Sequence, residues 1–88
     1  MKWKNGFILR QIAGEAILVP VGETAQQVPG LLGLSEGGVL LYEKLQTEAS
    51  RQDLIDALLQ EYAVDRAEAA RDVDSFLTRM RQLGLLEE

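Results

Sequence analysis

The sequence contains neither cysteine nor histidine among its 88 residues. Without cysteine there is no disulfide, no thiol nucleophile and no thiolate-bound metal. Without histidine a Ser-His-Asp triad is excluded, and the side chain that most often exchanges protons at neutral pH is missing. A zinc site would need carboxylates alone, which is unusual. These absences favour a binding or structural protein over an enzyme, and we expect no cofactor and no metal.

Long apolar runs are absent as well. The first apolar stretch is interrupted by Arg10, whereas a secretory segment needs about 7–15 uninterrupted apolar residues and a membrane-spanning helix about 20. We therefore expect a cytoplasmic protein that does not enter a membrane. Basic residues are few: nine lysines and arginines face 14 carboxylates, which gives a net charge of −5. This balance disfavours nucleic-acid binding, because phosphates bind clustered basic side chains.

The composition is that of a folded protein, with 47% apolar and 26% charged residues. The length fits one small core, so we expect residues 1–88 to form a single domain. The part up to about Leu34 contains both prolines and five of the eight glycines, and the remainder carries helix signals. Strands followed by helices predict an α+β fold.

Three strands are predicted in the first part of the chain. Residues 7–12 and 15–19 are rich in branched and aromatic side chains, and the two-residue connection Ala13-Gly14 predicts a tight β-hairpin. Alternation along both strands is imperfect and leaves the buried face undetermined. Residues 22–27 are expected to form a polar loop. Residues 28–34 predict a third, weaker strand, which Pro29 favours at the sheet edge.

Three helices are predicted to follow, with Ser35, Ser50 and Asp65 as their N-caps. We expect Gly84 to end the last helix, with the two following leucines folding back onto its last turn. Helices joined by short turns after a small sheet resemble a winged helix. The apolar residues at helical spacing are Gly38, Leu41, Tyr42 and Leu45, then Leu54, Ile55, Leu58, Leu59 and Tyr62, then Ala69, Val73, Phe76, Leu77, Met80 and Leu83.

The aromatic side chains are expected to pack rather than to bind ligands. Trp3 is expected to cover the sheet, and the rings of Tyr42 and Tyr62 to rest in the core with their hydroxyls at its margin. On the last helix, Asp72 and Arg79 border an apolar margin. Such a margin, beside an edge strand that contains glycines, is a groove of the kind that accepts an extended peptide.

Several short motifs occur in a fixed order: a first strand with Phe, Leu and Arg, a hairpin glycine, a strand that ends in proline, a helix start, and closing Asp-Val, Phe-Leu and Gly-Leu-Leu motifs. The residues are Phe7, Leu9, Arg10, Gly14, 17–20, 34–38, 42–43, 58–65, 72–73, 76–77 and 84–86. This pattern resembles the PqqD-like family, the recognition elements of ribosomally made, modified peptides. Ser35 stands where that family usually has Asn, Tyr42 where Trp is commoner, and Gly37 where Thr or Val is common.

The resemblance implies a three-stranded antiparallel sheet followed by three helices, a fold like a winged helix-turn-helix. It also implies that the leader segment of a precursor peptide adds as an extra strand to the third strand and packs against the third helix. The domain would then present the peptide, without catalysis, to a modifying enzyme, often a radical-SAM enzyme. The expected peptide-binding residues are Val28, Gly30, Leu31, Leu32, Gly33, Asp72, Phe76, Arg79 and Leu83.

Two of these residues carry charge. Arg79, together with Arg71, is expected to pair with an acidic leader and Asp72 with a basic one, at about 0–1 kcal/mol per surface pair. Two other classes of function stay open. One is a winged-helix DNA-binding regulator, although residues 66–82 carry four arginines against three carboxylates and residues 51–61 only one against three. The other is a structural subunit that forms a homodimer through the exposed strand edge.

Overall fold

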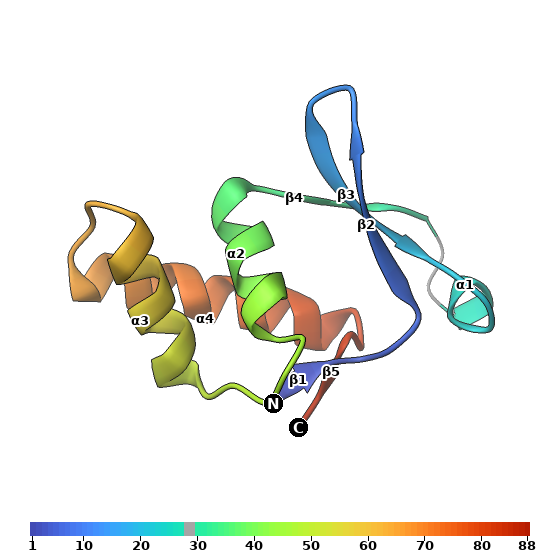
Figure 1. Ribbon diagram of the computed structural model, residues 1–88. Coiled ribbons are helices and arrows are strands. Elements are labelled where there is room, and N and C mark those ends of the chain that lie inside the picture. Colours follow the sequence, from blue (N-terminus) through green and yellow to red (C-terminus); the bar gives the residue numbers. More distant parts are fainter. Residues whose placement is uncertain (28–29) are drawn as a thin grey trace.

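The computed structural model describes residues 1–27 and 30–88 (Figure 1). Strands β2 (Phe7–Ile12), β3 (Glu15–Pro20) and β4 (Leu32–Leu34) form an antiparallel sheet in the order β2-β3-β4. Three long helices follow: α2 (Glu36–Lys44), α3 (Arg51–Glu61) and α4 (Arg66–Gln82). The predicted α+β fold is confirmed.

The third strand is shorter than predicted. It was expected over residues 28–34, but β4 begins only at Leu32. Gly30 has φ of +88°, a left-handed conformation that an extended strand does not adopt, so the chain turns before it pairs with β3. Val28 and Pro29 lie outside the described residues.

The hairpin between β2 and β3 closes as predicted through Ala13 and Gly14. Their φ angles are +52° and +82°, the sign that a type I′ turn needs at both central positions. The same pairing settles which face of the sheet is buried. Side chains directed to the core come from alternate positions of all three strands: Phe7, Leu9, Ala16, Leu18, Leu32 and Leu34.

The predicted N-caps are all confirmed. Ser35 Oγ accepts a hydrogen bond from the Gly38 N–H at 3.1 Å. Ser50 and Asp53 form a reciprocal capping box at the start of α3, and the Asp65 carboxylate accepts from an N–H in the first turn of α4. At the other end of α4, Gly84 has φ of +73° and begins a Schellman motif, so this helix ends as predicted.

Two elements were not predicted. A short helix, α1 (Thr24–Gln27), occupies the expected polar loop, packed so closely on Gly6 that a Cβ there would lie 1.9 Å from the Thr24 Oγ1. A second sheet joins β1 (Lys2–Trp3) to β5 (Leu86–Glu87) in antiparallel register. Only Leu85 therefore folds back onto α4, with its N–H on the Met80 carbonyl, while the residue after it pairs with β1.

The core lies between the inner face of the sheet and the three long helices. Its side chains include most of those predicted from helical spacing, among them Leu45, Leu54, Leu77 and Met80, each less than 2% exposed, whereas Tyr62 and Leu83 are exposed. No helix in the described part of the chain has the length and apolar character needed to cross a membrane.

Candidate functional site

Strand β4 has one unpaired edge. It pairs with β3 on one side only, and within residues 1–27 and 30–88 no other strand adjoins it. None of the other backbone hydrogen bonds of these residues involves Leu32, Gly33 or Leu34. Figure 1 shows this short strand running directly into α2. The backbone groups on the open edge are therefore available to a further strand.

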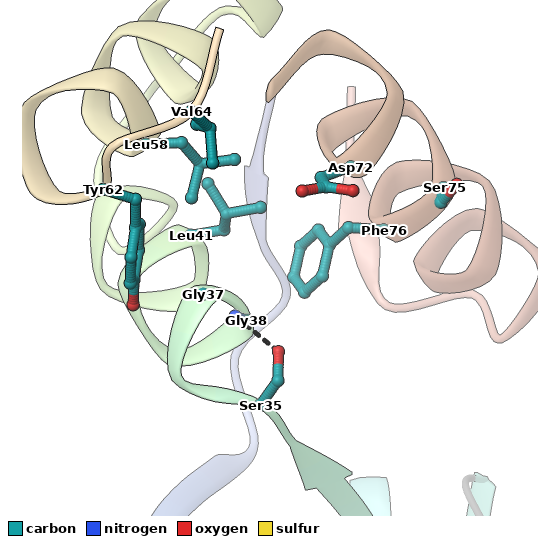
Figure 2. Close-up of a pocket in the computed structure, with 10 residues that line it drawn as sticks. All are labelled: Ser35, Gly37, Gly38, Leu41, Leu58, Tyr62, Val64, Asp72, Ser75 and Phe76. Carbon is teal, nitrogen blue, oxygen red and sulfur yellow. Dashed lines mark hydrogen bonds between the residues drawn. The ribbon is translucent and has the colours of Figure 1, made fainter. Parts of the chain in front are cut away.

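A pocket of about 450 Å³ begins where β4 ends. It lies between the start of α2, the end of α3 and the middle of α4, and Figure 2 shows the side chains that converge on it. The residues that line it are Ser35, Gly37, Gly38, Leu41, Leu58, Tyr62, Val64, Asp72, Ser75 and Phe76.

The walls of the pocket are apolar and its rim is polar. Leu41 and Leu58 are buried, whereas Phe76 is half-buried and faces them from α4 (Figure 2). The carboxylate of Asp72 projects from the same helix toward the pocket. Its side chain is exposed and makes no hydrogen bond or ion pair with the described residues. The site thus combines an apolar interior with one unpaired negative charge.

Glycines at the start of α2 keep the pocket open. A Cβ added to Gly37 would touch only a Leu58 methyl group, at 3.8 Å, so this space is empty because glycine has no side chain. A Cβ on Gly38 would lie in ordinary contact with the Ser35 Oγ at 3.4 Å and with Leu34 at 3.5 Å, so that position faces the end of β4 and not empty space. Replacing Gly37 by a larger residue would narrow the pocket without disturbing the backbone.

An aromatic cluster joins the pocket to the core. Trp3 is 4% exposed and packs edge-on against Tyr42, with ring centroids 5.1 Å apart. It also contacts Phe7 and Phe76, each at 6.1 Å. The predicted packing roles of Trp3 and Tyr42 are confirmed. The Phe76 ring in the pocket wall is thereby supported from behind by the core.

The sequence of the chain matches one family model over most of its length. The model described as "Coenzyme PQQ synthesis protein D (PqqD)" covers residues 15–86. The chain belongs to the PqqD family. This confirms the resemblance deduced from the order of the sequence motifs.

Two solved structures share the fold of this PqqD-family chain. One is "TbiB1 in Complex with the TbiA(beta) Leader Peptide", with 26% identity, a TM-score of 0.75, and coverage of 99% of this chain and 95% of that one. The other is "Lasso peptide synthetase B1 complexed with the leader peptide", with 20% identity, a TM-score of 0.73, and coverage of 99% and 96%. No curated protein matches the sequence.

The residues predicted to bind peptide in this PqqD-family protein fall into separate places. Asp72 and Phe76 line the pocket. Arg79 lies outside it, in a shallow depression further along α4, and Leu83 at the C-cap of α4 is 45% exposed and lines neither. The structure therefore brings together only part of the predicted helix margin.

The strand residues of the predicted site lie next to the pocket rather than in it. Leu32 is half-buried against the core, and Gly33 lines a second depression that meets the pocket at Ser35. Leu31, which precedes β4, is 63% exposed, and Gly30 forms the turn before it. Val28 lies outside the described residues.

Sequence reasoning missed part of the pocket. Leu41, Leu58 and Tyr62 were assigned to the core on helical spacing, and Val64 and Ser75 were not considered. For Tyr62 the core assignment was wrong, because the residue is the C-cap of α3 with an extended backbone and is 36% exposed. The sequence signal was the position of Tyr62 at the end of the predicted helix, because helical spacing no longer predicts burial where a helix ends.

Proposed function

We propose that this protein binds the leader segment of a ribosomally made precursor peptide, which adds as a strand to β4. Membership of the PqqD family supports the proposal, as do the two structural neighbours, each of which is a complex with a leader peptide. The 88 residues would act as one recognition domain. Its role would be presentation of the peptide, without chemistry of its own, to a modifying enzyme, with a radical-SAM enzyme as the leading candidate.

The observation that carries this proposal is an open strand edge beside an apolar pocket. A peptide that pairs with the main chain of β4 gains affinity without any demand on its sequence. Specificity then comes from alternate side chains, because every second one points to the same face as Leu32 and Leu34. The pocket that begins beyond Leu34 would then receive a side chain of such a peptide.

The experiment is a titration of the isotope-labelled protein with the leader peptide encoded by a short reading frame next to its gene. Amide hydrogen exchange and chemical shifts would be followed on both sheet edges. We expect protection and saturable shifts at residues 32–34 and shifts along α4. The matched internal control is β2, the opposite edge of the same sheet. Protection at residues 7–12 instead, or none on either edge, would contradict strand addition to β4.

Nothing in the described structure favours the DNA-binding alternative. Two of the four arginines of α4 already face carboxylates of the same chain, Arg66 with Asp56 at 3.3 Å and Arg81 with Glu88 at 2.8 Å. Cations that are neutralised within the protein contribute little to phosphate binding. Measured binding of the protein to duplex DNA at physiological salt, with an affinity that falls steeply as the salt concentration rises, would favour this alternative.

A further inference from the structure

We propose that the pocket beyond β4 receives a long basic side chain of the bound peptide, arginine in preference to lysine, with its cationic head at Asp72. The inference rests on the proposed function and adds to it the chemical class of the anchor. It follows from the shape of the pocket, from its charge and from its position relative to β4.

The shape fits a side chain that is apolar along its length. The interior is formed by Leu41, Leu58 and Phe76, and the space left by Gly37 extends it to about 450 Å³. Arginine and lysine carry three or four methylene groups that pack on apolar surface while the charged head stays at the edge. The pocket matches this division, because its only charged lining group lies on the α4 side.

The charge of the pocket decides between basic and other anchors. An acidic side chain would be repelled by the Asp72 carboxylate. A neutral apolar side chain would cover a carboxylate that has no partner among the described residues, at a cost in desolvation. A basic side chain supplies the missing partner. The net charge of −5 adds a long-range attraction for basic peptides.

The groups on the opposite wall place the cation near α4. The N-terminus of α2 has positive dipole character, which disfavours a cation there, although Glu36 in its first turn offsets part of this. Phe76 lies beside Asp72 on α4 in the pocket wall. A planar guanidinium stacks on an aromatic ring and also bonds a carboxylate through two N–H groups. Both features favour arginine over lysine.

The position of the pocket allows one peptide to pair with β4 and to place a side chain in the pocket at the same time. Ser35, the first residue after β4, lines the pocket and caps α2. A peptide strand on the open edge therefore reaches the pocket as it passes Leu34. One side chain near that point would enter the pocket while the backbone remains paired with β4.

The test uses two pentapeptides, acetyl-Val-Thr-Arg-Thr-Val-amide and the same peptide with citrulline, a neutral isostere, in place of arginine. Each is titrated into the isotope-labelled full chain and the amides of Gly37, Gly38 and residues 32–34 are followed. We expect the arginine peptide to bind about threefold to fivefold more tightly than the citrulline peptide, the range of an exposed to partly enclosed ion pair.

Three variants make the outcome specific. Asp72→Asn should abolish the difference between the two peptides, and Glu43→Gln, the same charge change at an exposed position of α2 outside the pocket, should preserve it. Gly37→Val should narrow the pocket and reduce the shifts at Gly38 for both peptides. Circular dichroism checks that each variant is folded.

Two results would overturn the inference. One is equal affinity of the arginine and citrulline peptides for the wild-type protein, and the other is an arginine preference that survives Asp72→Asn. Either result with protection still present at residues 32–34 would leave strand addition intact. Loss of protection there, with the arginine preference retained, would instead contradict the proposed function.

Discussion

Trp3 connects the sheet, the helices and the pocket through its three aromatic contacts. It is 4% exposed, and its indole Nε1–H has no hydrogen-bond partner among the described residues. The stabilisation from this residue therefore comes from packing of the ring, since an unpaired buried N–H costs free energy. Because the ring touches Phe76, its fluorescence should also report on the pocket.

Replacing Trp3 by alanine should lower the free energy of unfolding by about 3–5 kcal/mol, the range for large aromatic side chains in cores. Denaturant unfolding followed by circular dichroism measures this change. The matched control is Lys2→Ala in the same short strand, where the side chain is exposed and the expected change is within about 0.5 kcal/mol. Equal effects of the two substitutions would contradict the packing role.

Asp74 couples the stability of the helices to pH. The hydrogen bonds from the Arg51 guanidinium, at 2.7 and 3.0 Å, join α3 to α4 and lower the pKa of Asp74. A carboxyl whose pKa is lower in the folded state stabilises the fold above its unfolded pKa, about 3.9, and loses this contribution as the pH falls through the folded value.

We therefore expect the melting temperature of the wild type to fall between about pH 5 and about pH 2, and Asp74→Asn to remove part of that fall. Thermal unfolding at several pH values, followed by circular dichroism, measures this. Glu43→Gln is the control, because Glu43 has no ion pair among the described residues. If Asp74→Asn leaves the fall of the melting temperature at low pH unchanged, the Arg51–Asp74 pair does not contribute to the pH dependence of stability.

At the scale of elements, the turn of the β2-β3 hairpin requires a backbone conformation that its first residue, Ala13, does not favour. Ala13 occupies a left-handed conformation, φ of +52°, which costs a residue with a Cβ roughly 1–2 kcal/mol. Asparagine tolerates this conformation better, and Asn-Gly is a preferred pair in type I′ turns. Ala13→Asn should therefore raise the free energy of unfolding by about 0.5–1 kcal/mol.

Denaturant unfolding again measures the effect, with Gln11→Asn in the adjoining strand as control, where no gain is expected. Peptide affinity should not change, because Ala13 lies outside the pocket. If Ala13→Asn lowers the free energy of unfolding, the left-handed conformation of Ala13 is not a source of strain in the turn.

The elements that the sequence predicted are those with local signals. Ser35, Ser50 and Asp65 cap helices whose apolar stripes repeat at the helical period, and a glycine after a short turn marks the hairpin. The pairing of β1 with β5 has no local signal, because two-residue strands at opposite ends of the chain meet only after the core forms. The same holds for α1, which is a single turn without a buried residue.

The candidate site was predictable only in part for the same reason. Asp72 and Phe76 share one face of α4, so helical spacing places them together. The pocket also needs Gly37, Leu58 and Tyr62 from two other helices, and their convergence depends on how the helices pack. Helical spacing alone could not distinguish the pocket residues from Arg79 and Leu83 on the same predicted margin.

At the scale of the whole molecule, the acid excess predicts how salt affects peptide binding. With a net charge of −5, the protein attracts basic peptides over distances that salt screens, about 10 Å at 0.1 M. The affinity for acetyl-Val-Thr-Arg-Thr-Val-amide should therefore fall between about 0.02 M and about 0.5 M NaCl. The citrulline peptide, which is neutral, should change little. Parallel salt dependence of both peptides would contradict an electrostatic contribution.

The β1-β5 sheet has a consequence for how this protein can be joined to others. Both termini lie together in Figure 1, and the backbone N–H of Trp3 donates to the carbonyl of Leu45, just past the last turn of α2. The pocket lies at the first turn of that nine-residue helix, about 13 Å away along its axis. A covalent fusion at either terminus would thus emerge from the far end of α2 and leave the entry path of the peptide unobstructed.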